Sequence, residues 1–176
     1  MKMMRNKFLW LVGISILLWN CKKDPDQAAT TETEVDNSKL ISENDIKSFD
    51  YTEFSIDNKV QAQIKDWAEY YKLQDVIEKV KASDLHFFKD NEKTIKDAFK
   101  ELKATIPGTI KSPSIEARIL VVETKFYKLE SLFNLGTTSE KELEASVEEV
   151  LVAFSNLNLQ MNKKAEFDAI NIVKPQ

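Results

Sequence analysis

The sequence predicts an all-α fold, an up-down bundle of about four helices behind a disordered tether. After residue 20 only Gly108 and Gly136 are glycines, and residues 55–105, 114–135 and 137–174 contain neither glycine nor proline. Long stretches without these residues, rich in Glu, Lys, Leu and Ala, favour helix. Within them, apolar residues recur at spacings of three and four, as on one face of a helix. No alternating strand pattern competes with this reading.

The first two predicted helices span residues 56–82 and 84–105. Along the first, one apolar face ends at Tyr71 and a second face begins out of phase at Leu73, which predicts a bend near residues 71–74. Ser83 or Asp84 is the expected cap of the second helix, and Pro107-Gly108 is its expected end. The predicted core seam of the second helix contains Leu85, Phe88, Ile95, Phe99, Leu102 and Ile106, with Glu92 in one slot.

The third predicted helix spans residues 113–135, with Ser112 as cap and Pro113 at its first position, where a missing N–H is tolerated. Its seam is Ile115, Ile119, Val122, Phe126, Leu129 and Phe133. Leu120, Val121 and Tyr127 lie off this seam, so we expect this helix to be the most buried. We expect Gly136 to close it in the left-handed conformation.

The fourth predicted helix begins at residues 137–139 and ends after Phe167. Thr137-x-x-Glu140 and Ser139-x-x-Glu142 each match a capping box. Its seam is Leu143, Val147, Val150, Phe154, Leu157 and Met161. Short connections between such seams favour antiparallel neighbours, so we place the helical domain at residues 49–176 and expect the aromatic segment 49–54 to pack on it.

The N-terminus has the pattern of an export signal that ends at Cys21, the single cysteine of the chain. Lys2, Arg5 and Lys7 precede an apolar run of residues 8–19, which is shorter than the roughly 20 residues that a membrane span needs. Leu18-Trp19-Asn20-Cys21 resembles the lipobox of bacterial lipoproteins, and Cys21-Lys22-Lys23-Asp24 is similar to the start of small helical lipoproteins of the Bacteroidota. Trp19 and Asn20 depart from the small residues usual in that motif.

The resemblance implies a signal peptide over residues 1–20, fatty acylation of Cys21 and a disordered acidic tether over residues 21–48. It also implies a membrane partner through the lipid anchor, in the cell envelope and at the outer membrane. The alternative is a plain signal peptide with an incidental cysteine.

Residues 1–20 hold three basic and no acidic residues, so the remaining chain carries 22 basic against 29 acidic residues, a net charge of −7. This balance argues against nucleic acid as a partner.

No residue pattern points to catalysis, a metal or a cofactor. His86 is the single histidine, so the usual zinc sites and the paired histidines of di-iron bundles are missing. We interpret His86 as a surface or half-buried residue at a helix start. A haem held by His86 and Met161 has no supporting motif, and a glycosidase-like pair among the many carboxylates would need a cleft. We therefore predict no enzymatic activity.

Arg118 is the single arginine after the signal, against 21 lysines. Its planar guanidinium suits a bidentate ion pair, so we expect it to pair with Glu92 or another carboxylate between helices. An anion-binding arginine in a groove is the functional alternative.

Two functions remain open. The first is a non-enzymatic scaffold that binds an unknown envelope protein, with Leu120, Val121 and Tyr127 as the partner surface if they are exposed. The second is a bundle that holds an apolar small molecule, and this function would need an internal cavity. The aromatic residues considered for it are Trp67, Tyr71, Phe99, Phe126 and Phe154.

Overall fold

The computed structural model describes Asn37 and residues 40–170. Cys21, the predicted signal and most of the predicted tether lie outside the described residues. The described residues belong to one compact unit, Val35–Gln176, which is all-helical and contains no strand in its described part. The predicted fold class is therefore confirmed at this level.

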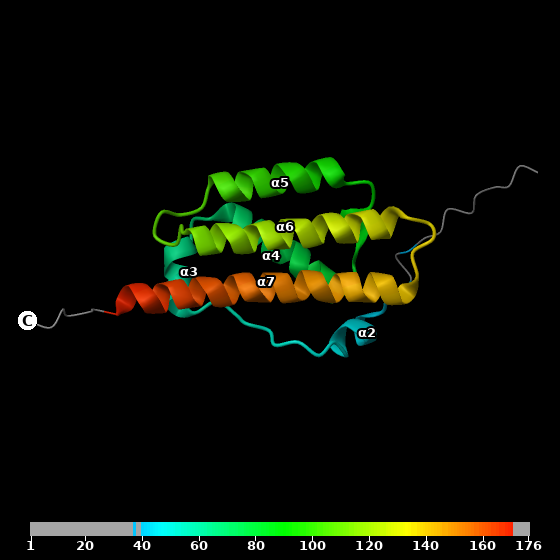
Figure 1. Cartoon of the computed structure of the whole chain (residues 1–176), viewed down its shortest axis with the longest axis horizontal. Coiled ribbons are helices and arrows are strands. Elements are labelled where there is room, and N and C mark those ends of the chain that lie inside the picture. Colours follow the sequence, from blue (N-terminus) through cyan, green and yellow to red (C-terminus); the bar gives the residue numbers. More distant parts are fainter. Residues whose placement is uncertain (1–36, 38–39, 171–176) are drawn as a thin grey trace, which may run out of the picture. The chain divides into compact units, whose positions relative to one another are not determined.

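The helices follow one another with short connections. In chain order they are α2 (Glu43–Lys47), α3 (Asn58–Ile64), α4 (Ala68–Lys81), the 3-10 helix η2 (His86–Phe88), α5 (Glu92–Ala104), α6 (Pro113–Asn134) and α7 (Glu140–Ala169). Figure 1 shows α5 beside α6 and α6 beside α7, each antiparallel to its neighbour, and α6 with α7 is the most extensively packed pair. All apolar seam residues predicted for residues 84–105, 113–135 and the fourth helix are buried.

Two predicted helix starts are confirmed by their side-chain caps. Ser112 accepts a hydrogen bond from the amide of Ile115, with Pro113 at the first position of α6. Ser139 and Glu142 form the reciprocal capping box that opens α7. The predicted role of Gly136 is wrong, because no described glycine has a positive φ; α6 ends instead where Leu135 turns extended.

The first predicted helix is two helices, and its break comes earlier than expected. α3 ends at Ile64 and α4 begins at Ala68, so the change of direction lies at residues 65–67 rather than 71–74. Trp67 is buried at this junction. Its indole N–H donates to the Thr105 hydroxyl at 3.1 Å, which ties the break to the end of α5.

The second predicted helix begins eight residues later than expected, at Glu92. Ser83 has a φ of 63° and Asp90 a φ of 48°, so left-handed residues flank a turn that contains η2. The turn is held by α6, because the Asn134 amide donates to the carbonyl of Phe88 at 2.8 Å. Glu92 is thus the first residue of α5 and is exposed, so it does not occupy a core slot.

The most buried helix is α7, not α6 as the sequence predicted. Beyond its seam, α7 also buries a second face with the small and polar residues Ser146, Ala153, Ser155, Asn158, Asn162 and Ala165. The segment 52–57, which has no helix, runs along this face (Figure 1), and Ser155, Asn158 and Asn162 bind its backbone. The aromatic segment 49–54 therefore packs on the helices, as expected.

The helical part also begins before residue 49, the boundary predicted from composition. Ile41 and Ile46 are buried in the core, and α2 opens with a capping box between Ser42 and Asp45. Residues 40–48 are therefore part of the packed unit, although their sequence is mostly polar. None of the helices in the described part of the chain is both long and apolar enough to cross a membrane.

Candidate functional site

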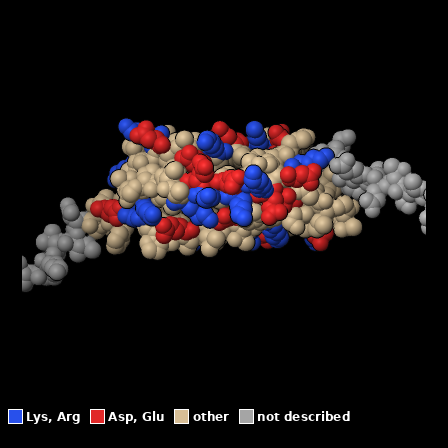
Figure 2. Space-filling view, turned by 90° about the horizontal axis from the view of Figure 1, so that it is seen from above, with Lys and Arg blue, Asp and Glu red and all other residues tan. Residues whose placement is uncertain are grey.

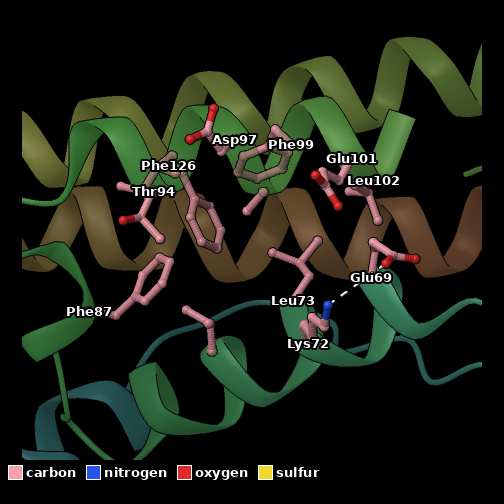
Figure 3. Close-up of a pocket in the computed structure, with 13 residues that line it drawn as sticks. Glu69, Lys72, Leu73, Phe87, Thr94, Asp97, Phe99, Glu101, Leu102 and Phe126 are labelled. Atoms are coloured by element: carbon pink, nitrogen blue, oxygen red, sulfur yellow. Dashed lines mark ion pairs between the residues drawn. The ribbon is translucent and has the colours of Figure 1, made fainter. Parts of the chain in front are cut away.

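A groove of about 320 Å³ lies between α4 and α5, and we call it the α4–α5 groove. Its volume is at the lower end of the range of small-molecule sites in proteins. Leu73 and Val76 line it from α4, while Ile95, Phe99 and Leu102 line it from α5. Figure 3 shows Leu73 and the phenylalanine rings directed into the space between the two helices. The groove is therefore predominantly apolar.

Three phenylalanines form the aromatic part of the α4–α5 groove. Phe126 reaches it from α6, and its ring centroid lies 5.1 Å from that of Phe99 and 6.5 Å from that of Phe87. Both pairs are close to edge-to-face, which is a favourable arrangement of aromatic rings. Phe126 is 1% exposed, whereas Phe87 is only partly buried, so the aromatic surface extends from the core to the groove's edge.

The position of Phe87 depends on the turn before α5. The Asn91 amide donates to the carbonyl of Phe87 at 2.8 Å, and the backbone N–H of Asp90 donates to the Asn134 side chain at 3.0 Å. These bonds hold the turn against α6 and place the Phe87 ring in edge-to-face contact with Phe126. Hydrophobic periodicity did not reveal this, because Phe87 stands next to the seam residue Phe88.

Polar contacts connect α4 and α5 near the end of the groove lined by Glu69 and Leu102. The Thr105 hydroxyl lies 3.1 Å from the Glu69 carboxylate and accepts from the indole N–H of Trp67. Lys72 pairs with Glu69 at 3.8 Å, the ion pair drawn in Figure 3. The contacts of Thr105 thus join the start of α4 to the end of α5, whereas the Lys72–Glu69 pair lies within α4.

The charged residues that line the groove are Glu69, Lys72, Asp97 and Glu101. They are three carboxylates and one ammonium, so the mouth of the groove is acidic. On the face viewed in Figure 2, acidic and basic side chains are interspersed. The groove thus has an apolar interior and a charged edge, a composition common among small-molecule sites in proteins.

Tyr127 lies beside this acidic edge. Burial raises the pKa of its hydroxyl, and the carboxylates of Glu123, Glu92 and Asp97 raise that pKa further. Burial likewise raises the pKa of Glu130, helped first by the negative charge of Glu92. Carboxylates of α5 therefore lie close enough to α6 to act on groups of that helix.

The aromatic residues considered from the sequence fall into two separate groups. Phe99 and Phe126 line the groove. Tyr70 stacks instead between Trp67, at a centroid distance of 5.5 Å, and Phe154, at 5.8 Å, and Tyr71 meets Tyr70 edge-on. Trp67, Tyr71 and Phe154 are not among the residues lining the groove.

The off-seam residues of α6 differ in exposure. Leu120 is 57% and Val121 41% exposed, whereas Tyr127 is partly buried and packs on the core. The predicted partner surface is therefore reduced to Leu120 and Val121.

The structure does not bring Arg118 and Glu92 together. Both are exposed, and none of the ion pairs within residues 40–170 contains either of them. The reason is the antiparallel hairpin of α5 and α6 (Figure 1), which places Glu92 near the later turns of α6 while Arg118 lies in its second turn.

His86 is at the surface, as expected, with its side chain 77% exposed. Its Nδ1 lies 2.8 Å from the carboxylate of Asp84. This contact, together with the hydrogen bond from the His86 backbone, lowers the pKa of Asp84. The pair belongs to the turn after α4 and is not among the groove residues.

One cluster of carboxylates has the spacing of a cation site. Oxygens of Asp45, Glu140 and Glu144 lie within 4.8 Å of one another. Asp45 already serves the capping box of α2, and Glu140 is in the first turn of α7, where the helix dipole favours acidic residues. Their positions at helix starts therefore explain the acidic side chains of Asp45 and Glu140, and we assign no site to the cluster.

Comparison with protein-family models, curated proteins and solved structures finds no match for this chain.

Proposed function

We propose that this chain is a non-enzymatic binding protein of the cell envelope, lipid-anchored at Cys21, that holds an apolar small molecule in the α4–α5 groove. In this proposal α4, α5, α6 and α7 act as an up-down bundle and the groove opens between two of its members. The observation that carries the proposal is the groove of about 320 Å³, lined by Phe87, Phe99 and Phe126.

The test is a titration with a neutral apolar fluorophore, N-phenyl-1-naphthylamine. Ala98 lines the groove and is exposed, so Ala98→Trp should fill the groove with little effect on folding. We expect this variant to weaken binding about tenfold or more, since the ligand loses most of its apolar contact area. Ala145→Trp, at an exposed position of α7 outside the groove lining, is the matched control. Equal affinity of the wild type, Ala98→Trp and Ala145→Trp for the fluorophore would contradict the proposal.

The envelope anchor is tested separately. Metabolic labelling with an alkyne fatty acid should label the wild-type protein, and Cys21→Ala should remove that label, because acylation requires the thiol. Equal labelling of both proteins would overturn the anchoring part of the proposal and leave the groove part standing.

A second candidate function is binding of an envelope protein through α6. It is favoured by the exposure of Leu120 and Val121 on this helix, since exposed apolar neighbours often mark an interaction surface. Crosslinking in native membranes should then yield a complex that the double variant Leu120→Ser/Val121→Ser no longer forms. Phe167→Ser removes an exposed apolar residue of α7 and should leave the complex intact. A complex that survives the double substitution rejects this candidate.

A further inference from the structure

The acidic mouth of the α4–α5 groove contains two carboxylates without a partner. Asp97 and Glu101 are four residues apart on α5, both line the groove and both are exposed. Their side chains form no hydrogen bond or ion pair with the described part of the chain. The single ammonium of the lining, Lys72, pairs with Glu69 instead, so Asp97 and Glu101 remain free to meet a charge on a ligand.

Two further carboxylates, Glu92 and Glu123, lie in the same region. Glu92 and Glu123 act on Tyr127 together with Asp97, so these carboxylates share one region of the surface. Glu123 is neutralised by Lys103, whose Nζ lies 2.7 Å from its carboxylate. A cation placed at the groove's edge would therefore be attracted, and an anion repelled.

We propose that the α4–α5 groove selects a cationic amphiphile, whose apolar body lies between Phe87, Phe99 and Leu102 and whose ammonium or amine meets Asp97 and Glu101. This inference rests on the proposed ligand-binding function and adds the chemical class of the ligand. A fatty acid fits the apolar interior equally well, but its carboxylate would meet two unpaired carboxylates at the edge.

The length of the groove limits the apolar body. On α5 the lining extends from Thr94 to Leu102, which corresponds to about 12 Å at 1.5 Å per residue. One leaflet of a bilayer is about 15 Å of hydrocarbon. The groove is thus shorter than a full membrane acyl chain, and it fits a short alkyl chain or a small ring system.

The experiment measures displacement of N-phenyl-1-naphthylamine by decyltrimethylammonium, decanol and decanoate, each below its micelle concentration and at low salt. The three compounds share an alkyl chain and differ in charge. We expect the ammonium compound to bind about tenfold more tightly than decanoate, with decanol between them. The difference should shrink at high salt, because the carboxylates are exposed.

The variants assign the preference to the two carboxylates. In Asp97→Asn/Glu101→Gln the three affinities should converge to within about twofold, with that of decanol unchanged. Glu166→Gln neutralises an exposed carboxylate of α7 outside the groove lining and should keep the wild-type order. A preference for decanoate, or a cation preference that survives in the double variant, overturns the inference.

The same data separate the two proposals. If Ala98→Trp abolishes decanol binding but the wild type shows no preference for the cation, the groove is supported and only the proposed ligand class is rejected. Absence of displacement by all three compounds, together with no effect of Ala98→Trp on the fluorophore, rejects the groove itself.

Discussion

Tyr70 shows how a single buried side chain connects two parts of the core. It is fully buried, and its hydroxyl donates to the Asn158 side chain at 2.9 Å. Burial is the main cause that raises the pKa of this hydroxyl, so it stays protonated and remains a donor. Asn158 in turn donates to the carbonyl of Phe54, which links α4 through α7 to the segment 52–57.

Removing this hydroxyl should destabilise the protein. Tyr70→Phe leaves the Asn158 carbonyl oxygen buried without a donor, and we expect the free energy of unfolding to fall by about 1–3 kcal/mol. Tyr71→Phe is the control, because the Tyr71 hydroxyl forms no side-chain hydrogen bond in the described chain, and it should change stability by less than about 0.5 kcal/mol. Urea unfolding measures the stability of both variants. Equal midpoints for Tyr70→Phe and Tyr71→Phe would contradict the stabilising role of the Tyr70–Asn158 hydrogen bond.

Glu142 makes stability depend on pH through the capping box of α7. The hydrogen bonds from the Ser139 side chain and backbone lower the pKa of Glu142 below its usual 4.5. A lowered folded-state pKa means that the unfolded chain binds a proton first as the pH falls. The stability that the ionised Glu142 carboxylate contributes is therefore fully present above the usual pKa, and it is lost as the pH falls through the folded-state pKa.

The corresponding prediction concerns Glu142→Gln, whose amide can still cap the helix but does not titrate. Between pH 6 and pH 3 the melting temperature of this variant should fall less steeply than that of the wild type, because one proton-linked group has been removed. Thermal unfolding followed by circular dichroism measures the two slopes. Parallel slopes would show that the capping carboxylate contributes nothing to the pH dependence.

At the scale of elements, the association of α7 with the segment 52–57 depends on side-chain amides and hydroxyls. The backbone N–H of Phe54 donates to Ser155 at 2.7 Å, and that of Asp57 donates to Asn162 at 2.9 Å. Asn162 also donates to the carbonyl of Ser55. An extended segment without strand partners must satisfy its backbone polar groups in this way.

Asn162→Ala should release one part of this segment. The Asp57 amide loses its acceptor, so we expect its hydrogen exchange to become several-fold faster, and stability to fall by about 1–3 kcal/mol. Asn156→Ala is the matched control, because Asn156 is on the same helix and its side chain forms no hydrogen bond in the described chain. If the Asp57 amide exchanges its hydrogen at the same rate in the two variants, Asn162 does not hold the segment.

At the scale of the whole molecule, the core includes residues that composition assigned to a tether. Ile41 and Ile46 are 3% and 5% exposed, and α2 contacts both α4 and α7. Fully burying an isoleucine contributes about 1.5–3 kcal/mol. The packed unit therefore depends on its N-terminal residues for a substantial part of its stability.

A pair of truncated chains tests this dependence. A chain that starts at Val35 should unfold in one cooperative transition, whereas one that starts at Phe49 should be less stable by about 3–6 kcal/mol, since two buried isoleucines are lost. Urea unfolding of both chains measures the difference. Equal midpoints would show that Ile41 and Ile46 pack on the unit without stabilising it.

Much of the helical architecture could be predicted from the sequence. The seams of α6 and α7 and their caps at Ser112 and Ser139 follow from local rules, because helical periodicity and capping act over a few residues. The candidate site was only half predictable. Phe99 and Phe126 belong to seams, but Phe87 enters the groove through a turn held by Asn134, which is 44 residues away from its bonded partner Asp90.

The sequence by itself determined the helical class, the extents of α6 and α7 and which of their faces are apolar, since these depend on residues three and four apart. Tertiary structure alone decided that Trp67 and Phe154 meet Tyr70 while Phe126 meets Phe87 and Phe99. It also decided that Asp97 and Glu101 border an apolar groove. The physical reason is that which helices become neighbours, and how tightly α4 approaches α5, depends on contacts between residues far apart in the chain.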